Sequence, residues 1–142
     1  MSIDTSSFTE SFKYVVAMRI LRDLADMLSI YCTSEANFVE LPDAYSSTSS
    51  MMPHKKNPVA AEMMRAKYSD LIGDLVTALI DDGQHIDVSV RNLSYAYKGI
   101  PEKTKEIVRK SHRIMGEMIK KSEFKDEQIK KKVEEIYASV KL

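Results

Sequence analysis

Residues 8–36 of the chain, FTESFKYVVAMRILRDLADMLSIYCTSEA, decide the fold class. Apolar side chains recur along this stretch every three or four residues, the spacing that returns side chains to one face of an α-helix. The stripe consists of Phe12, Val16, Ile20, Leu24, Met27 and Tyr31, and it is widened by Val15, Leu21 and Leu28. At a rise of about 1.5 Å per residue such a helix is about 40 Å long, and it needs neighbours to bury its stripe. The stretch therefore predicts a long helix inside a helical bundle.

A serine-rich loop and a second helix are predicted next. Pro42 and Pro53 bracket a run of hydroxyl side chains that compete for backbone hydrogen bonds, so residues 37–57 are predicted to form a loop. Asn57 is a good N-cap and Pro58 suits a first helical turn, so a helix is predicted to follow. Its apolar stripe is Met64, Tyr68, Leu71, Leu75, Ala78 and Leu79, and Asp81, Asp82 and Gly83 are predicted to end it.

The rest of the chain predicts two more helices. Residues 84–100 are predicted to be a mixed loop, followed by a helix over residues 101–121 and a short helix near residues 126–140. The expected apolar positions are Ile107, Ser111, Ile114 and Met118 in the first of these and Ile129, Val133, Ile136 and Val140 in the second. No internal repeat and no convincing strand pattern is present. The fold class predicted from these patterns is all-α, dominated by two long helices joined by the serine-rich loop.

Composition narrows the function classes. The 142 residues carry 21 basic and 21 acidic side chains, so no overall field favours nucleic acid or a membrane surface as a partner. No apolar run reaches the roughly 18 residues of a membrane span, and the N-terminus lacks the pattern of a signal peptide. Cys32 is the single cysteine and is predicted to be a small buried apolar residue. A cytoplasmic protein is expected.

The segment that carries chemistry is residues 47–58, STSSMMPHKKNP. It places serine hydroxyls and the ammonium groups of Lys55 and Lys56 just before a predicted helix N-terminus, where unpaired N–H groups and the helix dipole are positive. Such a site should attract a carboxylate or phosphate and should ease ionisation of a nearby hydroxyl. The alternative is a solvated polar loop followed by a well-capped helix, and the physical pattern alone does not separate the two.

This segment resembles the signature loop of the aspartase/fumarase superfamily, Gly-Ser-x-x-Met-x-x-Lys-x-Asn. The matching positions are Ser49, Met52, Lys55 and Asn57, whereas Thr48 replaces the glycine. The lead-in at residues 38–46, FVELPDAYS, is similar to the argininosuccinate lyase branch in particular. The resemblance implies part of that family's long-helix bundle: a central segment at residues 1–100 with the signature loop at 46–58, and the start of a C-terminal helical domain at 101–142.

The resemblance also implies a mechanism. Family members catalyse anti elimination across a succinyl C–N or C–O bond and release fumarate; a base removes a proton next to a carboxylate, positive groups hold the resulting dianion, and an acid assists the leaving group. Argininosuccinate would give fumarate and arginine, as in arginine biosynthesis. Carried over residue by residue, the catalytic residues are Ser49, as the base, and Glu62, as the partner of a catalytic histidine; the substrate-binding residues are Ser47, Lys55, Asn57 and Arg91.

Several departures from the family pattern stand beside these matches. Ser89 and Ser94 replace a substrate-binding tyrosine and glutamine in the string around Arg91. The segments that hold the family's substrate clamp and catalytic histidine have no counterpart in residues 1–142, so the chain is expected to be incomplete as an enzyme. Of its own histidines, His54 belongs to the loop, whereas His85 and His112 are expected at the surface.

Alternative functions stay open at this point. The first is one polypeptide of a lyase, active only when complemented by a separate N-terminal chain, with a small dicarboxylate as substrate and a homo-oligomer, a tetramer, as the expected assembly. No metal and no cofactor is expected. The second is a non-catalytic structural fragment or pseudoenzyme of the same superfamily that serves oligomerisation. A lyase of the adenylosuccinate lyase type and an unrelated helical adaptor are the remaining alternatives; the adaptor does not account for the signature loop.

Overall fold

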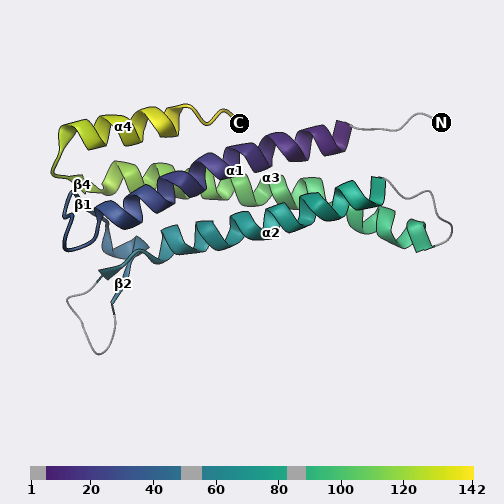
Figure 1. Ribbon diagram of the computed structural model, residues 1–142, viewed down its shortest axis with the longest axis horizontal. Helices are drawn as coiled ribbons and strands as arrows, with labels where there is room; N and C mark the ends of the chain where they lie inside the picture. The colour runs from purple at the N-terminus through teal and green to yellow at the C-terminus, as the bar shows by residue number, and fades with distance from the viewer. Residues whose placement is uncertain (1–5, 49–55, 83–88) are drawn as a thin grey trace.

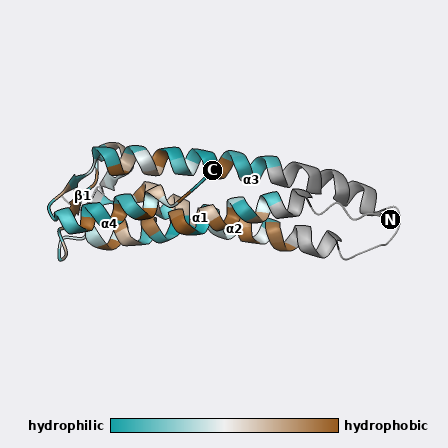
Figure 2. Ribbon diagram, turned by 90° about the horizontal axis from the view of Figure 1, so that it is seen from above, coloured by the Kyte–Doolittle hydropathy of each residue, from teal (hydrophilic) through white to brown (hydrophobic). Residues whose placement is uncertain are grey.

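The computed structural model describes the backbone of residues 6–48, 56–82 and 89–142, and the side chains of residues 10–47, 57–76 and 102–142. Three long helices contact one another pairwise, and a shorter fourth helix packs on the first and third (Figure 1). The helices are α1 (Ser6–Tyr31), α2 (Val59–Asp82), α3 (Ser89–Lys121) and α4 (Glu127–Ala138). The predicted all-α helical bundle is therefore confirmed, and its brown hydrophobic segments recur along the helices (Figure 2).

Two very short ladders and one 3-10 turn occupy one end of the bundle. Strand β1 (Val39–Glu40) pairs antiparallel with β4 (Glu123–Phe124), and β2 (Ser47–Thr48) pairs antiparallel with β3 (Lys56–Asn57). The 3-10 turn η1 (Asp43–Tyr45) lies between β1 and β2. The sequence predicted no strand, because two residues are too few to show the alternating pattern of a half-buried strand.

Helix α1 ends five residues earlier than predicted, at Tyr31 rather than residue 36. The Thr33 hydroxyl donates to the carbonyl oxygen of Ile30 over 2.7 Å and accepts from the Ala36 N–H over 3.3 Å, which offers the backbone an alternative to the helix. Asn37 then adopts a left-handed backbone conformation with φ of 52°, which turns the chain toward β1.

Helix α3 corrects the prediction for residues 84–100. Residues 89–100 were expected in a loop but are helical, so the helix begins twelve residues before Pro101, which was interpreted as its start. The proline instead lies inside the helix, at the cost of one backbone hydrogen bond. Residues 84–88 lie outside the described residues. The division into segments 1–100 and 101–142 stays a prediction, and α3 passes through its boundary without a break.

The core lies between the three long helices and extends under α4. Val15, Met18, Leu21, Ala25 and Leu28 of α1 are buried, and Leu24 joins them as predicted. Phe12 and Val16 of the predicted stripe are 50% and 44% exposed, so the buried face of α1 is turned away from them. Helix α1 has apolar residues on more than one face, and spacing along the chain does not decide which face meets the neighbouring helices.

Helices α2 and α4 bury residues of their predicted stripes, and α3 does so in part, because Ser111 and Met118 are buried whereas Ile107 and Ile114 are half-buried. Met64, Leu71 and Leu75 of α2 are buried, as are Val133 of α4 and Val140 beyond its end. Helix α2 begins at Val59, one residue later than predicted, and ends at Asp82 as predicted. Before α4, the carboxylate of Asp126 caps the helix by accepting from the N–H groups of Gln128 and Ile129. Within the described residues, no helix has the length and apolar character that crossing a bilayer requires.

Candidate functional site

The two ends of the predicted signature loop are held together by the ladder of β2 and β3. Ser47 lies opposite Asn57 and Thr48 lies opposite Lys56. Side chains opposite each other in an antiparallel pair have their Cβ atoms about 4.5–5.5 Å apart. Ser47 and Asn57, both predicted to bind substrate, are thus brought together from positions ten residues apart, with Ser47 exposed and Asn57 half-buried.

The structure does not describe the side chains of three predicted site residues. Ser49 and Lys55 lie outside the described residues, although the residues to which they are bonded, Thr48 and Lys56, pair in the ladder. Arg91 belongs to the backbone of α3, and its side chain lies outside the described part. The predicted meeting of Ser49 with Lys55 and the role of Arg91 therefore stay predictions.

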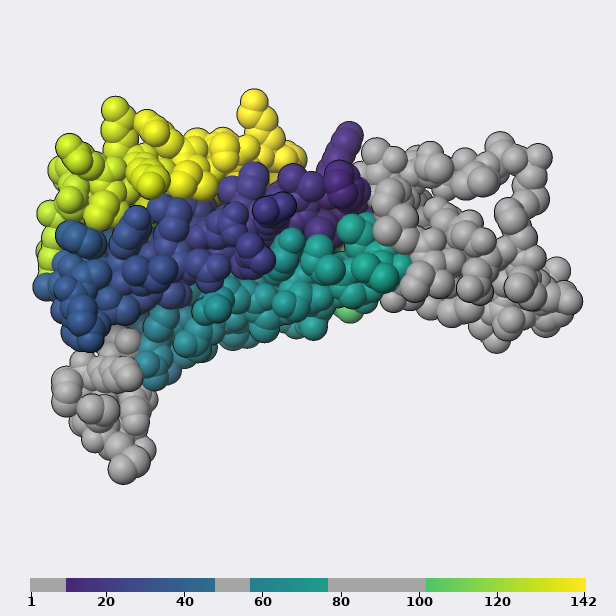
Figure 3. Space-filling model, viewed as in Figure 1, coloured from purple at the N-terminus to yellow at the C-terminus, as the bar shows by residue number. Residues whose placement is uncertain are grey.

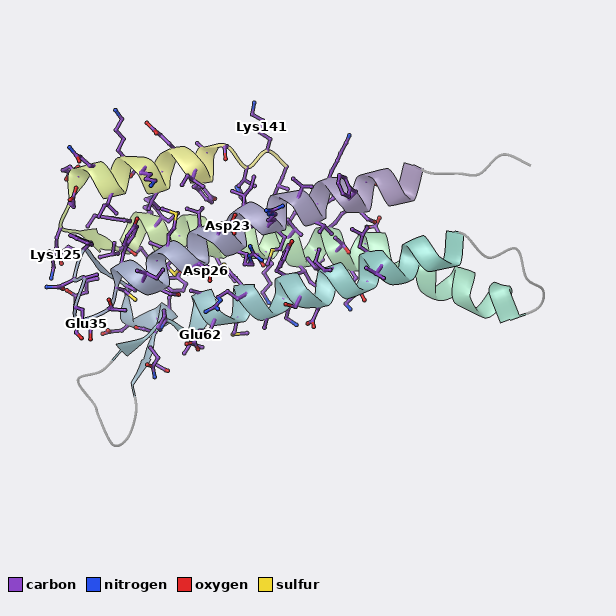
Figure 4. The ribbon with its side chains drawn as sticks, in the orientation of Figure 1. Asp23, Asp26, Glu35, Glu62, Lys125 and Lys141 are labelled. Atoms are coloured by element: carbon purple, nitrogen blue, oxygen red, sulfur yellow. The ribbon has the colours of Figure 1, made fainter. Side chains whose placement is uncertain are left out.

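Glu62 lies in the first turn of α2, where its N–H donates to the carbonyl oxygen of Pro58 over 3.0 Å. Its side chain is exposed and lines a shallow hollow of about 420 Å³ between α1 and α2. In Figure 4, Glu62 of α2 and Asp26 of α1 lie on neighbouring helices near the end that carries β2. The predicted catalytic glutamate is therefore beside the loop ends, at a helix start where a negative charge is favourable.

The hollow contains charged and aromatic residues that the sequence analysis did not select. Arg65 forms an ion pair with Asp26 through Nε and Oδ1, 2.8 Å apart. The guanidinium of Arg22 lies 4.7 Å from the ring centre of Tyr68 and also pairs with Asp23 over 2.9 Å. The contacts of Arg65 with Asp26 and of Arg22 with Tyr68 join α1 to α2, which lie side by side in Figure 3. No spacing along the chain predicts contacts between residues of two different helices.

The charge of this hollow limits what it can bind. Among the described residues that line the hollow, the guanidinium groups of Arg22 and Arg65 are matched by the carboxylates of Asp26 and Glu62, so these residues give no excess of positive charge for a dicarboxylate. Positive groups for a substrate carboxylate would have to come from the loop lysines or from other segments. Among the described residues, no three His, Cys, Asp or Glu side chains are grouped so that they could hold a metal ion.

The burial of Cys32 and of His112 differs from what the sequence predicted. Cys32, predicted to be buried, is half-buried, and its thiol donates to the carbonyl oxygen of Ser29 over 3.4 Å. Removal from water raises the pKa of the Cys32 thiol, so it is not primed as a nucleophile. His112, expected at the surface, is half-buried and stacks on Tyr137 with ring centres 4.7 Å apart. His54 and His85 lie outside the described residues.

Comparison with known proteins shows which family the chain resembles in sequence. Residues 7–73 match the family described as Lyase. The chain is 48% identical to the argininosuccinate lyase of Clostridium botulinum (strain Alaska E43 / Type E3) over 62 residues, which is 44% of the chain and 13% of that relative. It is 44% identical to the argininosuccinate lyase of Methanosarcina mazei over 101 residues, 70% of the chain and 20% of the relative. It is 34% identical to that of Thermoanaerobacter sp. (strain X514) over 128 residues, 85% of the chain and 27% of the relative.

These matches cover only part of each relative. The chain spans between 13% and 27% of the length of the three argininosuccinate lyases. Its sequence is thus homologous to a segment of those proteins. The family match over residues 7–73 contains the ladder of β2 with β3 and the start of α2.

Proposed function

From its membership of the fumarate lyase superfamily, we propose that this chain is part of a lyase of the argininosuccinate lyase type. The reaction would eliminate fumarate from argininosuccinate and release arginine, in a cytoplasmic setting. The observation that carries the proposal is the pairing of Ser47 with Asn57 immediately before α2, because it closes the signature loop at a positively polarised helix start.

Each predicted site residue has a role in this proposal. Ser49 removes the proton from the carbon next to a succinyl carboxylate, and Lys55 holds that carboxylate and favours the ionised serine. As the C–N bond breaks, its electron pair goes to the nitrogen, which a general acid protonates. Asn57, Ser47 and Arg91 bind the substrate. Glu62 pairs with the catalytic histidine, which the resemblance assigns to a segment without a counterpart in residues 1–142.

The assembly follows from the same reasoning. The substrate clamp and histidine would come from other segments, supplied by a separate chain or by other subunits of a tetramer. An exposed glutamate at the mouth of a hollow, as Glu62 is, suits a partner that approaches from outside the described bundle.

A non-catalytic role in assembly is the second candidate. Val16 and Ile30, on the outward face of α1, are 44% and 62% exposed. Exposed apolar residues aligned on one helix face favour contact with another chain. This candidate predicts the same bundle and the same oligomer but no elimination reaction.

A graft separates the two candidates. In the Thermoanaerobacter sp. argininosuccinate lyase, the matched segment is replaced by the corresponding residues of this chain. The rest of that lyase then supplies the other segments of the active site. Fumarate release from argininosuccinate is followed by ultraviolet absorbance, with adenylosuccinate as a second substrate. The graft should release fumarate from argininosuccinate, and Ser49→Ala should lower kcat about 10²–10⁴-fold.

Ser34→Ala is the matched control, because Ser34 is exposed in the turn after α1 and has no role in the proposed reaction. It should leave kcat unchanged. A graft that folds and assembles but releases no fumarate from argininosuccinate would remove the catalytic proposal and favour the non-catalytic one.

A further inference from the structure

The lead-in to the signature loop is fastened to the C-terminal third of the chain. The Lys125 N–H donates to the carbonyl oxygen of Phe38 over 2.9 Å, and the Lys125 ammonium donates to Oδ1 of Asn37 over 2.7 Å. The ladder between β1 and β4 continues from these contacts (Figure 1). Residues 37–40 are therefore held by residues more than 80 positions away in the sequence.

A second contact holds the lead-in closer to the loop. The hydroxyl of Tyr45, at the end of η1, donates to Oε2 of Glu117 in α3 over 3.0 Å. The Tyr45 ring is half-buried against the core. Removal from water raises the pKa of Tyr45, and the hydrogen bond and negative charge of Glu117 raise it further, so the hydroxyl remains a donor. A hydrogen bond to a carboxylate is stronger than one between neutral groups.

Tyr45 is close enough along the chain to control where the loop begins. Ser47 is two positions after Tyr45 in the chain, so their Cα atoms are at most about 7 Å apart. Ser47 is the residue that pairs with Asn57, and this pairing brings the two ends of the loop together. Any displacement of Tyr45 is therefore passed to Ser47 and to the ladder.

We propose that Glu117 is a positioning residue for the signature loop and acts through Tyr45. The inference rests on the proposed function for its catalytic meaning, because a loop that binds and deprotonates a substrate must be held in one place, and a misplacement of about 1 Å can cost about 10²-fold in rate. Within the described residues, Glu117 has a side-chain hydrogen bond to Tyr45 and none to a predicted site residue. It fixes the segment from which Ser47 and the loop begin.

The chain offers a matched contact that separates positioning from general stabilisation. The Arg109 guanidinium donates to the Tyr14 hydroxyl over 3.2 Å, which links α3 to α1. Like the contact of Tyr45, it joins a tyrosine hydroxyl to a charged side chain of α3 and is exposed to solvent. Tyr14 lies in α1 and is not part of the loop lead-in.

The test measures amide hydrogen exchange and amide chemical shifts of Ser47 and Asn57 by NMR in the full chain. Tyr45→Phe and Glu117→Ala should each speed exchange at these amides roughly three- to tenfold, the net effect of losing one solvent-exposed hydrogen bond. Glu117→Gln keeps an acceptor and should restore most of the protection. Tyr14→Phe should leave both amides as they are in the unchanged chain.

Two results would overturn the inference. One is that Tyr45→Phe leaves the exchange and shifts of Ser47 and Asn57 unchanged. The other is that Tyr14→Phe alters them as strongly as Tyr45→Phe does, since the effect would then be general.

Activity of the graft is a separate measurement. If the graft releases fumarate, Glu117→Ala should lower its kcat and Glu117→Gln should recover it, and an unchanged kcat in Glu117→Ala would overturn the inference. If the amides respond as expected but the graft is inert, the anchoring of the loop by Glu117 holds and the proposed function fails.

Discussion

At the residue scale, the contact between α3 and α4 depends on Gly116. A β-carbon at this position would lie 2.9 Å from Cζ of Tyr137 and closer still to its hydroxyl oxygen. The glycine leaves room for the Tyr137 ring, whose hydroxyl donates to the carbonyl oxygen of His112 over 3.0 Å. A glycine inside a helix has a cost in helix propensity, and here that cost is offset by the packing it allows.

Gly116→Ala should therefore destabilise the chain. Crowding against Tyr137 costs about 1–3 kcal/mol, and the gain in helix propensity returns about 1 kcal/mol, so the free energy of unfolding should fall by about 1 kcal/mol. Gly73→Ala in α2 is the matched control, because its β-carbon meets no heavy atom within 4 Å. It should raise the free energy of unfolding by about 0.5–1 kcal/mol. Chemical denaturation measures both, and an increase for both variants would mean that Tyr137 moves aside without cost.

At the element scale, α4 packs on the bundle through an apolar face and through a stacking contact between two rings. Val133 is fully buried, and Ile129 and Ile136 pack beside it. The stack of Tyr137 on His112 closes the contact with α3. Removal from water lowers the pKa of His112, because burial disfavours the charged imidazolium. The docking of α4 is thus tied to a neutral histidine.

The free energy of unfolding should decrease as the pH is lowered, because His112 binds a proton more readily in the unfolded chain. Its pKa is about 6.5 when unfolded and lower when folded, so above pH 6.5 the histidine is neutral in both states and its contact is fully present. As the pH falls from 6.5 through the folded pKa, the unfolded state binds the proton first and the stability is lost. The free energy of unfolding, measured by urea titration between about pH 7.5 and pH 5, should fall less in His112→Gln than in the unchanged chain. Equal falls would show that His112 does not contribute.

At the scale of the whole molecule, the three long helices leave apolar surface on α1. Phe12, Val16 and Ile30 are each more than 40% exposed, on the face opposite the buried one. A helix with apolar residues on both faces is typical of a helix covered on both sides. Contact with another chain would bury this face.

The chain should form an oligomer in solution through this face of α1. The double variant Val16→Glu, Ile30→Glu places two charges in the contact and should reduce the mass to that of one 16.2 kDa chain. Sedimentation equilibrium measures the mass. Lys67→Glu, an exposed charge change on α2, is the control and should leave the assembly intact. A single-chain mass for the unchanged protein would contradict the prediction.

Local patterns were enough for most of the fold and for part of the site. The four helices follow from periodic apolar residues, and α2 ends at Asp82, within the segment where the sequence predicted its end. The predicted start of α3 was wrong. Proline favours the first turn of a helix, so the sequence predicted a start at Pro101, but the helix begins at Ser89 and continues through the proline. The pairing of Ser47 with Asn57 was not foreseen, because a two-residue ladder leaves no pattern in the sequence.

The sequence alone determines the order of the helices and the loop, and which chemical groups the loop carries. It can do so because helix periodicity, capping and residue type are local properties. Contacts between distant residues are not. The buried face of α1, the anchoring of Tyr45 by Glu117 and the seating of Tyr137 on His112 became known from the folded molecule, since each depends on which helices lie side by side. The residues in the last two of these contacts are 72 and 25 positions apart, and they meet only after the helices have packed together.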